Sequence, residues 1–249
     1  MSINFNWNDY DDTSSARTSL NVEKFKMKDK GERTRFMFAL VNPKTKQVAL
    51  KKVTYFQYNN NVTKQWAKFI APENVNSQAY KVAQEHCGVA LTSYVTPILV
   101  YSTNTQGRVI SGDDYELTNL VLTPTRLTNI KSIQAEHDLS QCDILVTLED
   151  AKYQKMLFAS ATGCGVTDGF INQKDKQGNL KKTEININRD EVINEAIKMI
   201  DECETAVANN WTEQTIINYF KKDDEFDDEF DDVPFDKHPA SSDDDEPEF

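Results

Sequence analysis

Apolar and polar residues alternate with a period of two through much of the first half of the chain, a pattern typical of β-strands. In residues 33–41 the aromatic residues Phe36 and Phe38 share one side of the alternation. Arg33 and Arg35 take the other side. This pattern predicts a half-buried strand with a basic outer face.

Other segments extend this picture to a mixture of strands and helices. Runs rich in β-branched and aromatic residues predict strands at residues 47–58, 91–101, 115–122, 142–148 and 153–159. Helical spacing predicts short helices at residues 63–70 and 79–86, a helix opened by Thr123 and Pro124, a longer one capped by Asn188, and a last one from Thr212 to about Phe220. Residues 160–188 are expected to form a loop or a loose hairpin.

Strands and helices do not alternate regularly, which disfavours a doubly wound sheet. The pattern favours a β-rich α+β fold, a small β-barrel with helical insertions and a C-terminal helix. We expect a flexible arm at residues 1–19, one domain at residues 20–222 and a disordered acidic tail at residues 223–249.

Charge is distributed very unevenly. The last 27 residues hold 14 acidic residues and one lysine, a formal −13, although the whole chain carries only −12. Residues 17–81 run the opposite way, with 14 Lys and Arg against four acidic residues. A cationic surface on the same chain as a polyanionic tail suggests a protein that binds a polyanion and whose tail competes for that surface.

The basic segment also contains aromatic residues, and that combination suits unpaired nucleic acid. Cations attract the phosphate backbone, and flat rings stack on exposed bases. The candidate binding residues are Arg33, Arg35, Lys44, Lys46, Lys51, Lys52, Tyr55, Phe56, Tyr58, Lys64 and Trp66. The alternative is that several of these rings belong to the core and that the lysines only solvate the exterior.

Catalytic signatures are weak. The glycines near Gly163 are out of register for a dinucleotide-binding loop, and the three histidines lie far apart in sequence. We therefore expect no catalytic residue, no metal and no cofactor. A metal-dependent nuclease using Asp113, Asp114 or Asp143 is kept as a less favoured alternative.

The ends and cysteines of the chain suggest a cytoplasmic protein. No apolar run approaches the roughly 18 residues of a membrane span, and the N-terminus has no signal-peptide pattern. The four cysteines have no CxxC pair and are expected to be free thiols. Phe5, Trp7 and Tyr10 are candidates for contacts between neighbouring copies on DNA.

The acidic tail contains regularly placed phenylalanines. Residues 223–226, 227–230 and 231–235 form three near-repeats of acidic residues followed by phenylalanine, and residues 243–249 repeat the theme. A tail that served only solubility would not need such spacing. The candidate partner-binding residues are Phe226, Phe230, Phe235, Asp243, Asp244, Asp245 and Phe249.

This tail resembles the acidic, Phe-terminated tails of bacterial and phage single-stranded-DNA-binding proteins. Residues 138–155 are also similar to a segment of the phage proteins. The resemblance implies an OB-type barrel, binding of single-stranded DNA, and recruitment of replication or recombination proteins through the tail. In the bacterial family the Pro-Phe pair is terminal, whereas here Phe235 is internal and Glu248 separates Pro247 from Phe249.

Two functions therefore follow from the sequence. The first is a non-enzymatic protein that binds and protects single-stranded DNA in phage replication, recombination or repair, within the host cytoplasm. The second is an acidic interaction protein, a DNA mimic or a chaperone of basic partners, in which the tail is the active surface. The second explains the tail but not the cationic segment.

Overall fold

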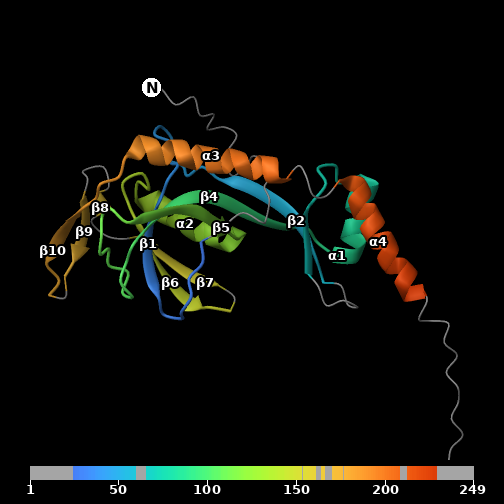
Figure 1. Ribbon diagram of the computed structural model, residues 1–249, viewed down its shortest axis with the longest axis horizontal. Coiled ribbons are helices and arrows are strands. Elements are labelled where there is room, and N and C mark those ends of the chain that lie inside the picture. Colours follow the sequence, from blue (N-terminus) through green and yellow to red (C-terminus); the bar gives the residue numbers. More distant parts are fainter. Residues whose placement is uncertain are drawn as a thin grey trace, which may run out of the picture.

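The computed structural model describes residues 25–59, 66–152, 154–160, 164–165, 170–175, 177–207 and 212–228. The fold is α+β and rich in strands (Figure 1). Its strands are β1 (Arg33–Phe38), β2 (Lys51–Asn59), β3 (Trp66–Ile70), β4 (Leu91–Tyr101), β5 (Tyr115–Leu122), β6 (Ile144–Asp150), β7 (Lys155–Ser160), β8 (Cys164–Gly165), β9 (Phe170–Lys174) and β10 (Leu180–Glu184). Its helices are α1 (Gln78–Cys87), α2 (Pro124–Glu136), α3 (Arg189–Val207) and α4 (Glu213–Asp228).

The long strand β4 organises the main sheet. One edge of β4 pairs with β5 through residues 94–101. The other edge pairs first with β2, through residues 91–95, and then with β1, through residues 98–101. From there the sheet continues through β1 to β6 and β7, and through β2 to β3, giving the order β3-β2-β4-β1-β6-β7. All of these pairings are antiparallel.

Between β1 and β2 the chain leaves the edge of β4 and returns to it. Residues 40–50 form this excursion, which we call the tip hairpin. The last backbone bond to β4 before it is donated by Ala39 N to Pro97 O, at 3.1 Å. Within it, Val41 and Val48 form an antiparallel bridge, and Asn42 N donates to Gln47 O. The tip hairpin therefore projects a short basic turn from the edge of β4, at the point between its pairings with β1 and β2.

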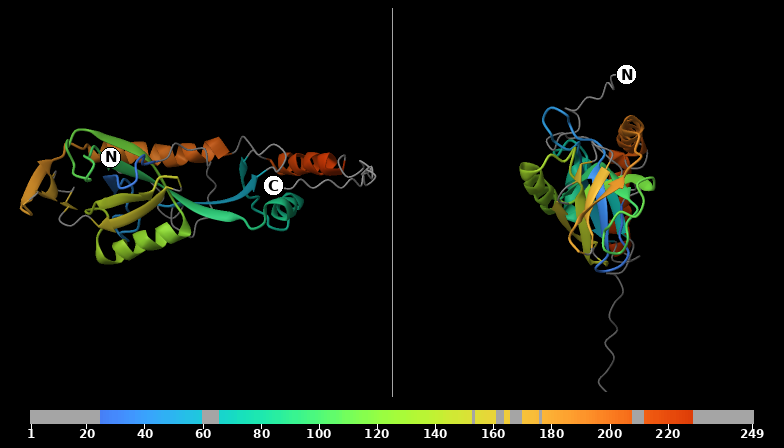
Figure 2. Two further views of the ribbon diagram at one scale, coloured as in Figure 1. Left: turned by 90° about the horizontal axis from the view of Figure 1, so that it is seen from below. Right: turned by 90° about the vertical axis from the view of Figure 1, so that its left-hand side faces the viewer.

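Helices pack on both faces of the main sheet. Seen edge-on, α2 lies on one side of the sheet and α3 on the other (Figure 2). On the α2 face, Phe36 and Phe38 pack into one core cluster with Leu127. On the α3 face, Met37 packs with Ile200 in a second cluster.

A third cluster lies at the far end of the sheet, where α1 and α4 pack side by side (Figure 1). It is built on the α2 face of β2 and β3 from Phe56 and Phe69. Phe220 of α4 packs against Phe69, with ring centroids 6.0 Å apart, and stacks on His86 of α1 at 4.5 Å. Burial of these aromatic side chains holds the two helices to the sheet.

Most of the predicted elements are confirmed. Thr123 caps α2 by accepting a hydrogen bond from Arg126 N, at 3.4 Å. Asn188 caps α3 through Glu191 N, also at 3.4 Å. Strands β9 and β10 pair as an antiparallel hairpin, and with β8 they make a separate three-stranded sheet.

Three expectations differ from the structure. The sheet is not closed into a barrel, because its end strands β3 and β7 do not pair in the described residues. The helix predicted at residues 63–70 is wrong: residues 66–70 are strand β3, with Phe69 paired against Phe56 of β2. Helix α4 continues to Asp228, six residues into the segment expected to be tail.

No helix in the described part of the chain combines the length and the hydropathy needed to cross a bilayer. The expected arm at residues 1–19 lies outside the described residues.

Candidate nucleic-acid interface

Two of the cations predicted to bind DNA lie in the protein interior. The Arg35 side chain is buried, and its Nε lies 3.2 Å from Oδ2 of the fully buried Asp143. Lys51 is also fully buried, and its Nζ donates to the backbone oxygen of Ile200, at 3.3 Å. Both side chains are on the α3 face, so the prediction of a basic outer face for β1 is corrected. Both charges have partners inside the protein, and neither side chain can reach a strand bound at the surface.

Two of the predicted aromatic residues are also held by packing. Phe56 is fully buried in the cluster beneath α1 and α4, so its assignment as a stacking residue is wrong. Tyr58 is half-buried, and its ring contacts Phe220 edge-on at 5.1 Å and Tyr219 at 6.2 Å. The alternative that some rings belong to the core therefore holds for this side of β2.

Tyr55 lies on the opposite face of β2 from Phe56, which is the α3 face, because successive side chains of a strand alternate between its two faces. Its cross-strand partners are Ile70 on β3 and Leu91 on β4. We call these three residues the Tyr55 row. Tyr55 and Ile70 are half-buried and Leu91 is 44% exposed. Directly opposite residues in neighbouring strands hold their Cβ atoms about 5 Å apart, so the row forms a continuous strip of surface.

A cation accompanies this strip. Lys68 is exposed, and its Nζ lies 6.0 Å from the centre of the Tyr55 ring. This distance is the outer limit of a cation–π contact, so the ammonium group lies near the ring without covering its face. Val89, just before β4, is 80% exposed and adds to the apolar surface near Leu91.

The remaining predicted residues of the β2–β3 region have mixed positions. Trp66 begins β3 and pairs with Asn59, which places it on the same face as Tyr55 by register. Its side chain and the whole of Lys64 lie outside the described residues. Lys52 is half-buried on the α2 face, opposite Tyr94, and is therefore not part of the Tyr55 row.

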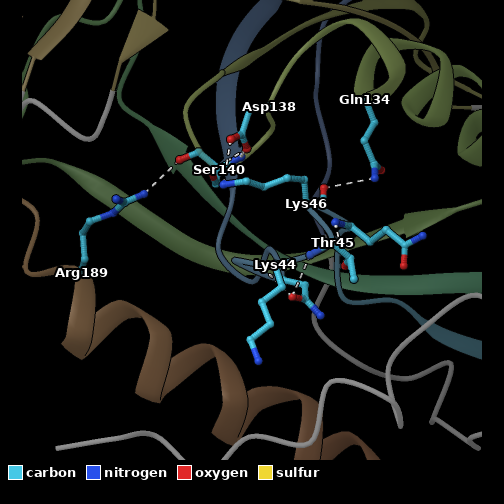
Figure 3. Close-up of polar contacts among 9 residues, drawn as sticks. Lys44, Thr45, Lys46, Gln134, Asp138, Ser140 and Arg189 are labelled. Carbon is cyan, nitrogen blue, oxygen red and sulfur yellow. Dashed lines mark hydrogen bonds and ion pairs between the residues drawn. The ribbon is translucent and has the colours of Figure 1, made fainter.

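The tip hairpin holds two further predicted cations, Lys44 and Lys46, and both are exposed (Figure 3). Lys46 Nζ pairs with Asp138 Oδ2 at 3.0 Å, and Gln134 Nε2 of α2 donates to Lys46 O at 3.1 Å. The contacts fasten the tip hairpin to the end of α2.

The same cluster reaches the start of α3. Ser140 Oγ donates to Asp138 Oδ1 at 2.6 Å, and Arg189 Nη2 donates to Ser140 O at 3.0 Å (Figure 3). The hydrogen bonds from Ser140, together with Lys46, hold the pKa of the Asp138 carboxyl below its usual value. Lys44 is exposed, and its side chain points away from this cluster (Figure 3).

Arg33 is exposed at the start of β1 and pairs across the ladder with Thr147 of β6. The exposed cations predicted from the sequence thus fall at separate places: the start of β1 and the tip hairpin. The sequence pattern missed Ile70 and Leu91 as members of the site. Only the register of β2 with its two neighbours brings these residues to Tyr55.

The carboxylates of the nuclease alternative do not converge. Asp113 and Asp114 lie in an exposed loop, where Asp113 Oδ1 accepts from Asn186 Nδ2 at 2.7 Å. Asp143 is buried against Arg35. Within the described ranges, no group of three or more His, Cys, Asp or Glu side chains is arranged to hold a metal ion.

The tail residues can be placed only in part. Phe226 lies in α4. Phe230, Phe235, Asp243, Asp244, Asp245 and Phe249 lie outside the described residues. Within the described ranges, Cys87 and Cys142 are not in disulfide bonds, and burial raises the pKa of Cys87 to about 11.

Comparison with known proteins adds no assignment: no family model matches the chain, and no curated protein matches it.

Proposed function

We propose that this chain binds single-stranded DNA without enzymatic activity, through the α3 face of β2 and β3 around Tyr55. The observation that carries the proposal is the Tyr55 row. It combines a half-buried ring, apolar cross-strand neighbours on both sides and a nearby lysine on one strip of sheet. Such a strip offers a stacking surface to a base and a positive charge to its phosphate.

The energetics require more than one ring. Stacking contributes about 1 to 3 kcal/mol per base, whereas micromolar affinity requires about 8 kcal/mol. Trp66 shares the face by register, and Lys64 lies in the connection between β2 and β3. We include both in the proposed site, with Lys44 and Arg33 as additional contacts for a longer strand.

The resemblance to phage proteins supplies the biological setting of the proposal. The protein would cover unpaired DNA during replication, recombination or repair in the host cytoplasm, and recruit partners through its acidic Phe repeats. The function does not depend on a closed OB barrel, because an open antiparallel sheet can present the same stacking surface.

Titration with oligo-dT tests the site directly. We expect Tyr55→Ala to weaken binding about 5- to 150-fold, the equivalent of losing one stacked base. Tyr55→Phe keeps the ring and should bind almost as tightly as the unmodified protein. The matched control is Leu157→Ala, because Leu157 is 51% exposed on β7 and lies away from the row. Equal affinities for Tyr55→Ala and Leu157→Ala would refute the proposed site.

Competition by the tail is tested by truncation after Asp228, which leaves α4 complete. The removed residues 229–249 hold nine acidic residues and one lysine, a formal −8. We expect the truncated protein to bind oligo-dT more tightly, most clearly at low salt, because screening weakens a charged competitor. Unchanged or weaker binding would remove the competition from the proposal.

A further inference from the structure

The two residues that pair directly with Tyr55 in the sheet both carry apolar side chains. Ile70 and Leu91 are the cross-strand partners of Tyr55 in the ladder, and Leu91 is the more exposed of the two. Lys68 is displaced by two residues along β3 from Ile70, so the ammonium approaches the ring from a diagonal position. A flat ligand lying on the Tyr55 ring would therefore extend onto hydrocarbon at its edge.

We propose that Leu91 is a specificity-determining residue that favours thymine over uracil at the Tyr55 position. The inference rests on the proposed function and names the base preference of the same site. Thymine and uracil have the same hydrogen-bonding groups and differ only in the C5 methyl group of thymine. A site that contacts base edges with Leu91 gains from that methyl group because the contact removes it from water.

The expected size of the preference follows from the burial of one methyl group. Burying one CH₂ or CH₃ group changes affinity about fourfold, equivalent to about 0.8 kcal/mol at 1.4 kcal/mol per tenfold change. Self-stacking of the free strand contributes little to the comparison, because both bases are pyrimidines on the same deoxyribose backbone. The preference is thus a property of the protein surface.

The test compares dissociation constants for oligo-dT and oligo-dU of equal length, at one salt concentration. The unmodified protein should bind oligo-dT about fourfold more tightly for each base stacked on the row. Leu91→Ala should bring the ratio close to one, whereas Leu157→Ala, the exposed leucine on β7, should leave it unchanged. Thermal unfolding followed by circular dichroism confirms that each variant is folded.

A second comparison needs no variant. Oligonucleotides of 5-methyldeoxycytidine and deoxycytidine differ by the same methyl group, and the methylated strand should also bind about fourfold more tightly. A ratio of one for the thymine pair in the unmodified protein, or a ratio that persists in Leu91→Ala, overturns the inference. If affinity for oligo-dT still depends on Tyr55 in that case, the proposed function stands. Absence of Tyr55-dependent binding to either strand overturns the proposed function itself.

Discussion

The α3 face of the main sheet has two sections with the same strand pattern and opposite surroundings. Under α3, the cationic side chains of Arg35 and Lys51 are buried and bonded to Asp143 and to a backbone oxygen of Ile200. Further along β2, Tyr55 on the same face is half-buried between Ile70 and Leu91. In the first section the charged side chains stabilise the fold. In the second section the Tyr55 row is the surface proposed to bind a ligand.

The alternation of apolar and polar residues along a strand does not reveal which face of the sheet is covered by a helix. Lys51 and Tyr55 are separated by four residues and have the same parity. Lys51 is bonded to α3, which begins about 140 residues later in the chain, so its burial depends on an element distant in sequence. The predictions below separate the two sections by their response to substitution.

The largest effect is expected for Arg35→Ala. Removing one partner of a buried ion pair leaves the other charge uncompensated, at a cost of about 3 to 5 kcal/mol in the free energy of unfolding. The control is Arg33→Ala, two residues earlier on β1 but exposed, with an expected change within about 0.5 kcal/mol. Urea unfolding at pH 7 measures both, and similar losses for the two variants would contradict the assignment of Arg35 to the interior.

A smaller effect is expected when Lys68 and Lys51, both on the α3 face, are compared by the salt dependence of DNA binding. Lys68→Met should reduce the slope of log K against log salt for oligo-dT by about 0.7, the value for losing one phosphate contact. Lys51→Met should leave that slope unchanged, because Lys51 cannot reach the surface. Fluorescence titrations at several salt concentrations give the slopes. A reduced slope in a folded Lys51→Met protein would contradict the conclusion that Lys51 is structural and does not contact DNA.

The smallest effect concerns the tip hairpin, where charge is exposed. Hydrogen bonds from Ser140 and the contact with Lys46 lower the pKa of Asp138 in the folded protein. A depressed pKa contributes stability above the unfolded-state value, and this contribution is lost as pH falls through the folded-state value. Asp138→Asn should therefore cost only a few tenths of a kcal/mol at pH 7.

The same variant should match the unmodified protein at a pH below the lowered pKa of Asp138, where the carboxyl group is protonated. Unfolding free energies measured from pH 7 downwards provide the check. A loss that grows on acidification would contradict the sign of the linkage.

Local sequence signals predicted much of the fold. Thr123 and Pro124 mark the start of α2, and Asn188 marks α3, because capping depends on side chains within one turn. Residues 66–70 were assigned to the wrong element because the spacing of Trp66, Phe69 and Ile70 resembles a helix. These residues form a strand because they pair with β2, and such pairing cannot be read from the local sequence.

The candidate site was predictable only in part for the same reason. Tyr55 could be proposed from its basic and aromatic neighbours in sequence. Leu91 could not, because its place beside Tyr55 depends on the register of β2 with β4, about 35 residues apart. The burial of Arg35, Lys51 and Phe56 likewise depends on elements distant in sequence.

Photo-crosslinking tests the central claim most directly. An oligo-dT carrying 5-iododeoxyuridine, whose iodine replaces the thymine methyl group, would be irradiated in complex with the full chain and the crosslinked peptides identified by mass spectrometry. The account predicts crosslinks within β2 and β3 at residues 55–70, and at residues 89–91 at the start of β4. Crosslinks confined to the α2 face, with none in β2, β3 or the start of β4, would contradict it.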